Sequence, residues 1–420
     1  MIGPRLIFTF ALCLQWSGIP GPSNPVAAAS ISTLPEYGVP LSPEETRNMR
    51  DQIARLSRDL GLSQELIAAI AKVLGLKTPK SQYSFAKFIG DVGAKANEGK
   101  ALFGKLVELK TEVGRLSDPV VRDPGLKILA LAQAALSAGR IEEAEQKFGE
   151  LTLLRNSESE NAQDLWLKAV ELAAQTATLR LDEDRATEIW DNAGRQFEKK
   201  LATDRRGKFK SIVEAAAFQY SKGLRLLQGS PLVDAKRRYE AGLMAFPEQE
   251  FPNEWGILKR NLGNLLVSQG IMLGGPAANL KYSNAIELLN AALGVQEAAV
   301  NRKEWAQTQN SLGIAFFRQG ELVEGKLSEG LFAKAITAYQ NAQMVNTKEI
   351  SPVQWTDAQT NIALVYHIQG QRLGGAGGID LMQKAARPYE EALPVYALNR
   401  NFSGWAATQN NLAGTFAASG

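Results

Sequence analysis

The residues of this chain that come closest to a catalytic or ligand-binding motif are GELVEGKL, at positions 320–327. They nearly fit the phosphate-binding loop G-x-x-x-x-G-K-[ST], in which a glycine-rich turn follows a β-strand and a final Ser or Thr holds magnesium. Here the motif ends in Lys326-Leu327, and Glu321 and Glu324 stand where phosphate would bind. We therefore expect no nucleotide at this stretch and no cofactor elsewhere.

Histidine and cysteine are too scarce for most catalytic or metal-binding sites. His367 is the sole histidine and Cys13 the sole cysteine, which excludes disulfides, cysteine clusters and histidine-rich zinc sites. His367 falls within a periodic helical segment and is interpreted as a helix-surface or groove-lining residue. We predict no metal site and no catalytic residues.

The charge balance gives no case for nucleic acid as a partner. Lys and Arg total 47 against 44 for Asp and Glu, a formal net charge of +3, which is too small to attract a polyanion. The basic run at 199–210 contains no interleaved aromatic pair for stacking on bases, so it is interpreted as a solvated helix end.

The N-terminus is typical of an export signal. Arg5 precedes an apolar run from Leu6 to Trp16, and small residues up to Ala29 would allow cleavage before Ser30. The run is too short to cross a bilayer. Residues 1–29 are therefore interpreted as a signal peptide of a periplasmic or extracellular protein without a membrane span in its mature chain. The alternative is an uncleaved apolar leader on a cytoplasmic protein.

The elements that must position any functional residue are repeats. Four tryptophans are each separated by 50 residues, and they are Trp255, Trp305, Trp355 and Trp405. Apolar or small residues follow each of them at +7, +8 and +11, which is the periodicity of one helix face. Glycine recurs at +15, where we expect the left-handed cap that ends the helix.

A second helix follows in each copy, marked by small, large and small residues at +30, +34 and +37. These residues are Ala285, Leu289 and Ala292, then Ala335, Tyr339 and Ala342, then Ala385, Tyr389 and Ala392. Such spacing lets two helices approach closely around one bulky side chain. Each copy therefore predicts an antiparallel helix pair.

Leu-Gly-x-x-Tyr in the first helix and Ala-x-x-x-Phe-x-x-Ala in the second resemble the tetratricopeptide repeat, here in a long-period form of the bacterial type. The resemblance implies an all-α fold, a right-handed α-solenoid (superhelix) of antiparallel helix pairs. The usual period is about 34 residues, and we expect the added residues to change the turn between the two helices.

In the resembled family the first helices form the wall of a binding groove. The resemblance implies that a protein or peptide partner contacts a set of side chains at groove positions. These are Arg260, Asn264, Asn310, Phe317, Thr360, His367 and Asn410. Some relatives clamp a terminal carboxylate with basic residues and asparagines, but Ser311, Asp357 and Asn361 replace the later members of that set. The polar cluster inside these helices is equally consistent with amides that bond to neighbouring helices.

The pattern divides the chain into four parts. They are the leader at 1–29, an N-terminal helical region at 30–124, shorter and divergent helix pairs at 125–250, and long-period repeats at 251–420 that end in a single helix. In the second part, a two-heptad seam is formed by Leu102, Leu106, Leu109, Val113 and Leu116. It is too short for a coiled coil, and we expect it to dock onto the first repeat.

The last helix, from Trp405 to Gly420, carries no charge, although the end of a repeat array needs a polar face. Either the natural chain continues or another molecule covers this edge, for example a second copy. The function indicated is a non-catalytic scaffold. The alternative is a glycan-acting enzyme that uses paired carboxylates, for which Asp357 is the sole acid at a groove position.

Overall fold

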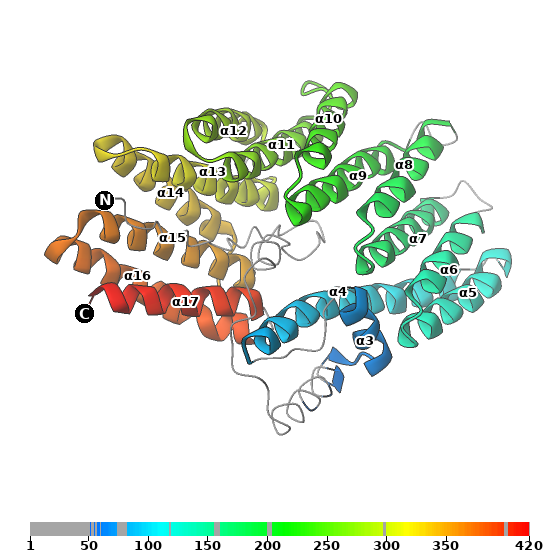
Figure 1. Ribbon diagram of the computed structural model, residues 1–420. Coiled ribbons are helices and arrows are strands. Elements are labelled where there is room, and N and C mark those ends of the chain that lie inside the picture. Colours follow the sequence, from blue (N-terminus) through cyan, green and yellow to red (C-terminus); the bar gives the residue numbers. More distant parts are fainter. Residues whose placement is uncertain are drawn as a thin grey trace. The chain divides into compact units, whose positions relative to one another are not determined.

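The computed structural model describes residues 60–73, 82–116, 119–154, 160–199, 204–296, 300–398 and 402–419, with a few positions between 51 and 58. The described chain is a succession of helices without a strand (Figure 1), which confirms the all-α prediction. Contacts divide it into two compact units, called here the N-terminal unit (Ile31–Ser221) and the C-terminal unit (Lys222–Gly420). The predicted signal peptide and the cysteine lie outside the described residues.

The N-terminal unit contains α3 (Gln64–Val73), α4 (Gln82–Arg115), α5 (Pro119–Ser137), α6 (Ile141–Leu153), α7 (Glu160–Leu179), α8 (Glu183–Lys199) and most of α9 (Arg205–Leu226). Consecutive helices from α5 to α8 pack against one another. The first of these, α5, begins at Pro119 and continues through Pro124. The first repeat helix therefore starts before residue 125.

The long helix α4 lies along α5 and α7. Four of its five seam residues, Leu102, Leu106, Leu109 and Val113, are buried in one apolar cluster with residues of α5, α6 and α7, whereas Leu116 at the end of the seam is only half-buried. The prediction that this seam docks onto the repeats is confirmed. A polar contact adds to this packing, since Lys95 of α4 donates a hydrogen bond to the Thr178 carbonyl of α7 at 3.2 Å.

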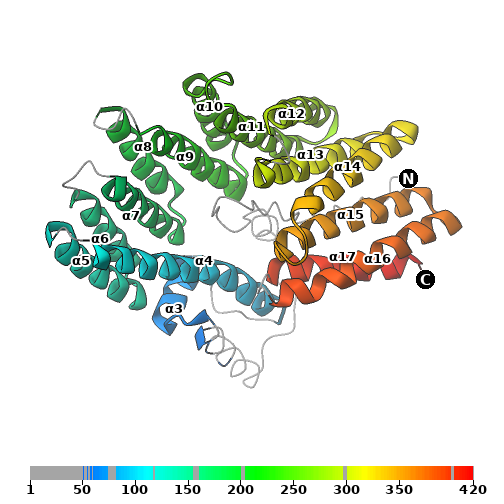
Figure 2. The same ribbon diagram turned by 180° about the vertical axis from the view of Figure 1, so that it is seen from behind.

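The C-terminal unit contains α10 (Gly229–Ala245), α11 (Pro252–Leu273), α12 (Gly275–Val295), α13 (Arg302–Leu322), α14 (Gly325–Val345), α15 (Pro352–Leu373), α16 (Gly375–Leu398) and α17 (Phe402–Ser419). The pairs α11/α12, α13/α14 and α15/α16 follow one another as hairpins, and both views show this order (Figures 1 and 2). The last helix, α17, packs against α16 and α15. The solenoid of antiparallel helix pairs is thereby confirmed.

The extra residues of the 50-residue period lie within the helices. A single residue, Gly274, separates the 22-residue α11 from the 21-residue α12, and Gly374 separates α15 from α16 in the same way. The expectation that the turn would change is therefore wrong. Both helices of the pair are lengthened by about one to two turns, and the turn stays minimal.

The glycines at +15 do not end their helices as predicted. Gly270 and Gly370 are buried inside α11 and α15. The glycines of positive φ in these two turns are instead Gly274 (65°) with Gly275 (58°), and Gly374 (63°) with Gly375 (56°). A Cβ at Gly370 would lie 2.7 Å from the Gly378 carbonyl oxygen of the second helix. Glycine is needed at +15 because the paired helices nearly touch there.

The small, large and small residues of the second helices are buried as expected. Tyr339 is 1% exposed, and its ring fits against Gly313 of the first helix, where a Cβ would lie 2.6 Å from the ring. Ala335 and Ala342 flank it without exposure to solvent. This lock holds each helix pair together.

The carboxyl end of α13 is held by the next repeat. Arg372 of α15 donates hydrogen bonds to the carbonyls of Gly320 (3.0 Å), Glu321 (2.6 Å) and Val323 (3.1 Å). A guanidinium placed there satisfies the last carbonyls of a helix and complements its dipole. The GELVEGKL stretch is therefore the joint between two helices, and no strand precedes it. No helix among the described residues has the length and apolar character needed to cross a membrane.

Candidate binding face on the first helices

The predicted groove residues lie on α11, α13, α15 and α17 of the C-terminal unit, and they differ widely in exposure. Arg260, Asn264, Phe317 and His367 are buried. Asn310 and Thr360 are half-buried, and Asn410 is exposed. Four of the seven side chains therefore lie within the packing between helices. The prediction that all seven side chains line an open groove wall is corrected for these four.

Arg260 on α11 carries the most unusual charge of the face. Its side chain is 5% exposed, and one guanidinium nitrogen donates to the side-chain oxygen of Gln307 on α13. Arg260 forms no ion pair with a carboxylate of any described residue. Burial lowers the pKa of Arg260 to about 10, although Glu304 and Tyr239 oppose the shift. The group nevertheless stays cationic at neutral pH.

Side-chain amides of α11 and α13 have hydrogen-bonding atoms that no described residue satisfies. The Gln307 Nε2 and Asn310 Oδ1 atoms are buried without a partner, as are both polar atoms of the Asn261 side chain. Buried polar atoms without partners are rare because each costs about 1–3 kcal/mol. Together with Arg260, these amides offer several donors and acceptors to a polar group.

Gln307 was not among the predicted residues. It occupies position +2 of its copy, which is one of the expected groove positions, and this register is the signal that identifies it. The pairing of Arg260 with Gln307 joins position +5 of one first helix to position +2 of the next. This contact brings α11 and α13 together on the predicted face.

Phe317 contributes to packing and not to an exposed wall. Its ring is 1% exposed and lies 5.9 Å from the ring of Phe332 on α14. Arg318 covers another part of the ring, with 5.5 Å between its guanidinium carbon and the ring centre. The aromatic residue predicted for partner contact is therefore part of the α13/α14 interface.

Asp357 forms a second polar group on α15. Tyr396 of α16 donates a hydrogen bond to Asp357 Oδ1 at 2.7 Å, and Thr360 donates to the Asp357 carbonyl at 3.0 Å. Burial raises the pKa of Asp357 to about 7, although the Tyr396 hydrogen bond opposes the shift. Much of the population therefore holds a neutral carboxyl group at neutral pH.

His367 joins α15 to α17. Its Nδ1 lies 2.9 Å from the Thr415 hydroxyl, which itself donates to the Asn411 carbonyl at 2.8 Å. Burial lowers the pKa of His367. The imidazole is neutral at pH 7 and serves as a donor between two helices.

The N-terminal unit has a different polar cluster where α4, α7 and α9 meet. Lys105 of α4 and Lys210 of α9 both bind Glu171 of α7, the latter at 2.7 Å. Burial raises the pKa of Glu171, but the two lysines outweigh it and the net shift is downward. Burial raises the pKa of the neighbouring Glu214 to about 7, against the opposing effect of Lys210. Two acids in one cluster therefore hold different charge states.

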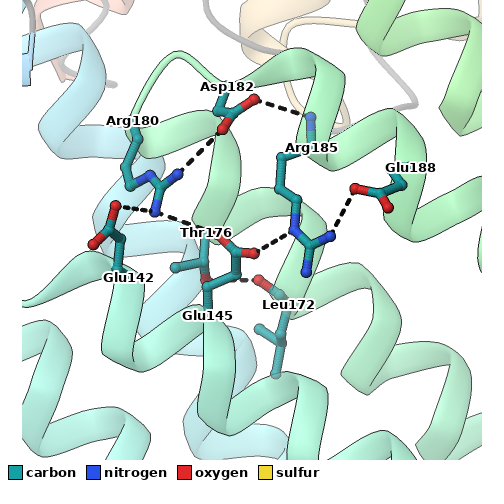
Figure 3. Close-up of polar contacts among 8 residues, drawn as sticks. All are labelled: Glu142, Glu145, Leu172, Thr176, Arg180, Asp182, Arg185 and Glu188. Carbon is teal, nitrogen blue, oxygen red and sulfur yellow. Dashed lines mark hydrogen bonds and ion pairs between the residues drawn. The ribbon is translucent and has the colours of Figure 1, made fainter.

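An ion-pair network joins α6 to the turn between α7 and α8 in the same unit. Its charged members are Glu142, Glu145, Arg180, Asp182, Arg185 and Glu188 (Figure 3). Asp182 accepts the backbone N–H of Arg185 at 3.0 Å and so caps α8. Each charge has a partner within the network, so we interpret it as a structural tie.

Metal chemistry has no support in the part of the chain that the structure describes, since no group of three or more His, Cys, Asp or Glu side chains is arranged to hold an ion. Comparison with known proteins leaves the family open: no family model matches this chain, and no curated protein matches it significantly.

Proposed function

We propose that this chain is a non-catalytic scaffold of the tetratricopeptide-repeat type, exported across a membrane to the periplasm or the outside, which binds a protein or peptide partner on the first helices of the C-terminal unit. The repeat type is supported by helix pairs locked by small, large and small residues, as at Ala335, Tyr339 and Ala342. Export rests on the apolar leader alone.

The observation that carries the binding proposal is Arg260. A buried cation without a described carboxylate partner costs stability, and the unsatisfied amides of Gln307 and Asn310 add to that cost. An acidic or carbonyl-rich segment of a partner would supply acceptors to the guanidinium and to Gln307. The proposed partner is therefore a polar or acidic peptide.

Binding and stability provide separate readouts. Arg260→Met removes the buried charge and keeps the volume, so we expect unchanged or higher stability, by up to about 3 kcal/mol. The same change should weaken binding to immobilised acidic peptides at least tenfold. Lys259→Met is the matched control, because Lys259 neighbours Arg260 but lies over the Trp255 ring, 4.7 Å from its centre.

Fluorescence titration with acidic peptides and with their Asn/Gln counterparts would measure the effect. Equal binding by wild type and Arg260→Met would contradict the proposal. Affinity capture from an extract with Arg260, Asn264, Asn310 and Asn410 all changed to Ala would then test the whole face, provided that circular dichroism shows the variant to be folded.

The second candidate is a glycan-acting enzyme with two carboxylates. Opposite pKa shifts at Glu171 and Glu214 favour it, because an acid and a base of such a pair need different charge states. The two lysines bound to Glu171 argue against it, since they occupy the oxygens that would act on a substrate. Glycan hydrolysis lost on Glu214→Gln, or on Asp357→Asn, would reverse the order of the two candidates.

A further inference from the structure

Two half-buried lysines of the N-terminal unit share one carboxylate. Lys105 of α4 and Lys210 of α9 both donate to Glu171 of α7, and no other described residue accepts a hydrogen bond from either ammonium group. Gln175 also donates to Glu171, at 3.1 Å, so this carboxylate is well supplied with donors. An ammonium group has three N–H donors. Each lysine therefore keeps two donors for a further group, and both side chains reach solvent, with exposed fractions of 33% and 31%.

Glu214 lies one helical turn after Lys210 on the same face of α9, and its carboxyl group has no partner. The residue is only 9% exposed, and no described residue forms a hydrogen bond or an ion pair with it. Its oxygens are nevertheless not among the atoms that packing closes off from solvent. A buried carboxyl group without a partner is costly. A ligand that reaches these oxygens would supply the missing hydrogen bond.

The charged groups that act on Glu214 come from α4, α7 and α9. Burial raises the pKa of Glu214 to about 7, and the charge of Glu171 adds to this shift, whereas Lys210 and Lys105 oppose it. On α8, Asp184 accepts a hydrogen bond from an α9 glutamine at 3.0 Å and does not contribute. When Glu214 is neutral, the two lysines and Glu171 together carry one net positive charge. This charge balance suits a monoanion.

We propose that Lys105, Lys210 and Glu214 form a binding site for a carboxylate group, which the two ammonium groups attract and with which the neutral Glu214 carboxyl group shares its proton. A carboxylic acid that donates to a carboxylate forms a short, strong hydrogen bond, and the free lysine donors satisfy the other oxygen of the ligand. A dianion such as a phosphate monoester fits less well, because Glu171 repels it. The site belongs to the N-terminal unit, so this inference is independent of the binding function proposed for Arg260.

Binding of the carboxylate is coupled to protonation of Glu214. The ligand binds the neutral form, so its affinity is constant at acid pH and falls as the pH rises through the pKa of Glu214. From a pKa of about 7, the affinity should fall about tenfold between about pH 6 and about pH 8. Each binding event at about pH 8 should also take up about 0.9 proton from solution.

Isothermal titration calorimetry of the full chain with three capped peptides tests the site. The probes are N-acetyl-Gly-Glu-Gly-amide and its counterparts with Gln or phosphoserine at the centre, and we expect the Glu peptide to bind most tightly. Heats measured in two buffers of different ionisation enthalpy give the proton uptake. Lys210→Met should lower the affinity for the Glu peptide at least about tenfold, because a charge-assisted hydrogen bond is lost. Lys168→Met is the matched control, since Lys168 of α7 pairs with Glu112 of α4, and it should leave the affinity unchanged.

Glu214→Gln provides a result that misfolding cannot imitate, because a gain of binding is expected. The amide keeps a donor for the carboxylate and cannot ionise, so the variant should bind the Glu peptide equally at both pH values and about tenfold more tightly than the wild type at about pH 8. Failure of the Glu peptide to bind the wild type below about 10 mM at acid pH would overturn the proposal. Equal binding of the Gln or phosphoserine peptide, or an unchanged pH dependence in Glu214→Gln, would overturn it as well.

Discussion

Asp357 provides the sharpest test of the electrostatics of the C-terminal unit. Its carboxyl group is 8% exposed and accepts the Tyr396 hydroxyl. We expect Asp357→Asn to stabilise the protein at alkaline pH, because the amide keeps an acceptor for Tyr396 and cannot ionise. If this replacement stabilises the protein, the cost of burying the charged carboxylate exceeds the stabilisation that its hydrogen bond provides.

The magnitude follows from proton linkage. Burial raises the pKa of Asp357 from 3.8 to about 7, so the folded state binds more protons than the unfolded state between these values. Stability is therefore lost as the pH rises through this window. At about 1.4 kcal/mol per pKa unit, the ionised carboxylate costs about 4 kcal/mol above pH 7 and about 2 kcal/mol near pH 5.

Urea denaturation of wild type and Asp357→Asn, followed by far-ultraviolet circular dichroism between about pH 5 and pH 8, measures this difference. We expect the variant to gain about 2 kcal/mol more at the alkaline end than at the acid end. Tyr396→Phe, which removes the donor, should steepen the pH dependence. A variant less stable than the wild type at pH 8 would refute the reasoning, because the carboxylate would then be stabilised in the fold.

Three further predictions concern stability and can be checked by the same denaturation assay. Gly313→Ala should lower the free energy of unfolding by about 1–2 kcal/mol, because its Cβ would meet the Tyr339 ring. Gly330→Ala, with open space around it, should raise the free energy of unfolding by up to about 1 kcal/mol. Equal effects of the two changes would contradict the helix lock. Leu227→Gly should gain about 1 kcal/mol, since Leu227 is 52% exposed and has a φ of 51°; a loss would show that its side chain contributes. Arg372→Met should lose about 1–2 kcal/mol through the carbonyls of α13, and no change would mean that water replaces the guanidinium.

The helix pairs were predictable because their signal repeats. Copies of one register average out the local ambiguity of any single segment, so the lock at Tyr339 follows from the repeated spacing. The docking of Leu106, which lies outside these copies, follows from the apolar periodicity of its own helix. The ends of the helices were not predictable in the same way. Glycine has two structural uses, a left-handed cap and a close helix contact, and the sequence alone does not distinguish Gly270 from Gly274.

The sequence predicted which positions of each first helix lie on the candidate face, but not how exposed their side chains are. Position within a repeat determines which side of the helix carries Arg260 or His367. Burial depends in addition on how closely the next helix approaches, which is decided by side chains of other copies such as Gln307 and Thr415. A contact between two copies, such as Arg260 with Gln307, joins different positions of the repeat. Aligning the copies with one another therefore does not reveal it.

The glycine at +15 explains why the longer repeat keeps a minimal turn. Helices lengthened by one to two turns would splay apart beyond the lock at +8 and +34 unless a second contact held them. Gly320 and Phe332 form that contact, since a Cβ at Gly320 would lie 2.9 Å from the Phe332 ring. Position +27 is large in each copy, and position +23, Ser328 in this one, is small. The second helix therefore continues its alternation of small and large residues towards the turn, and two locks per pair make a connection of one or two residues sufficient.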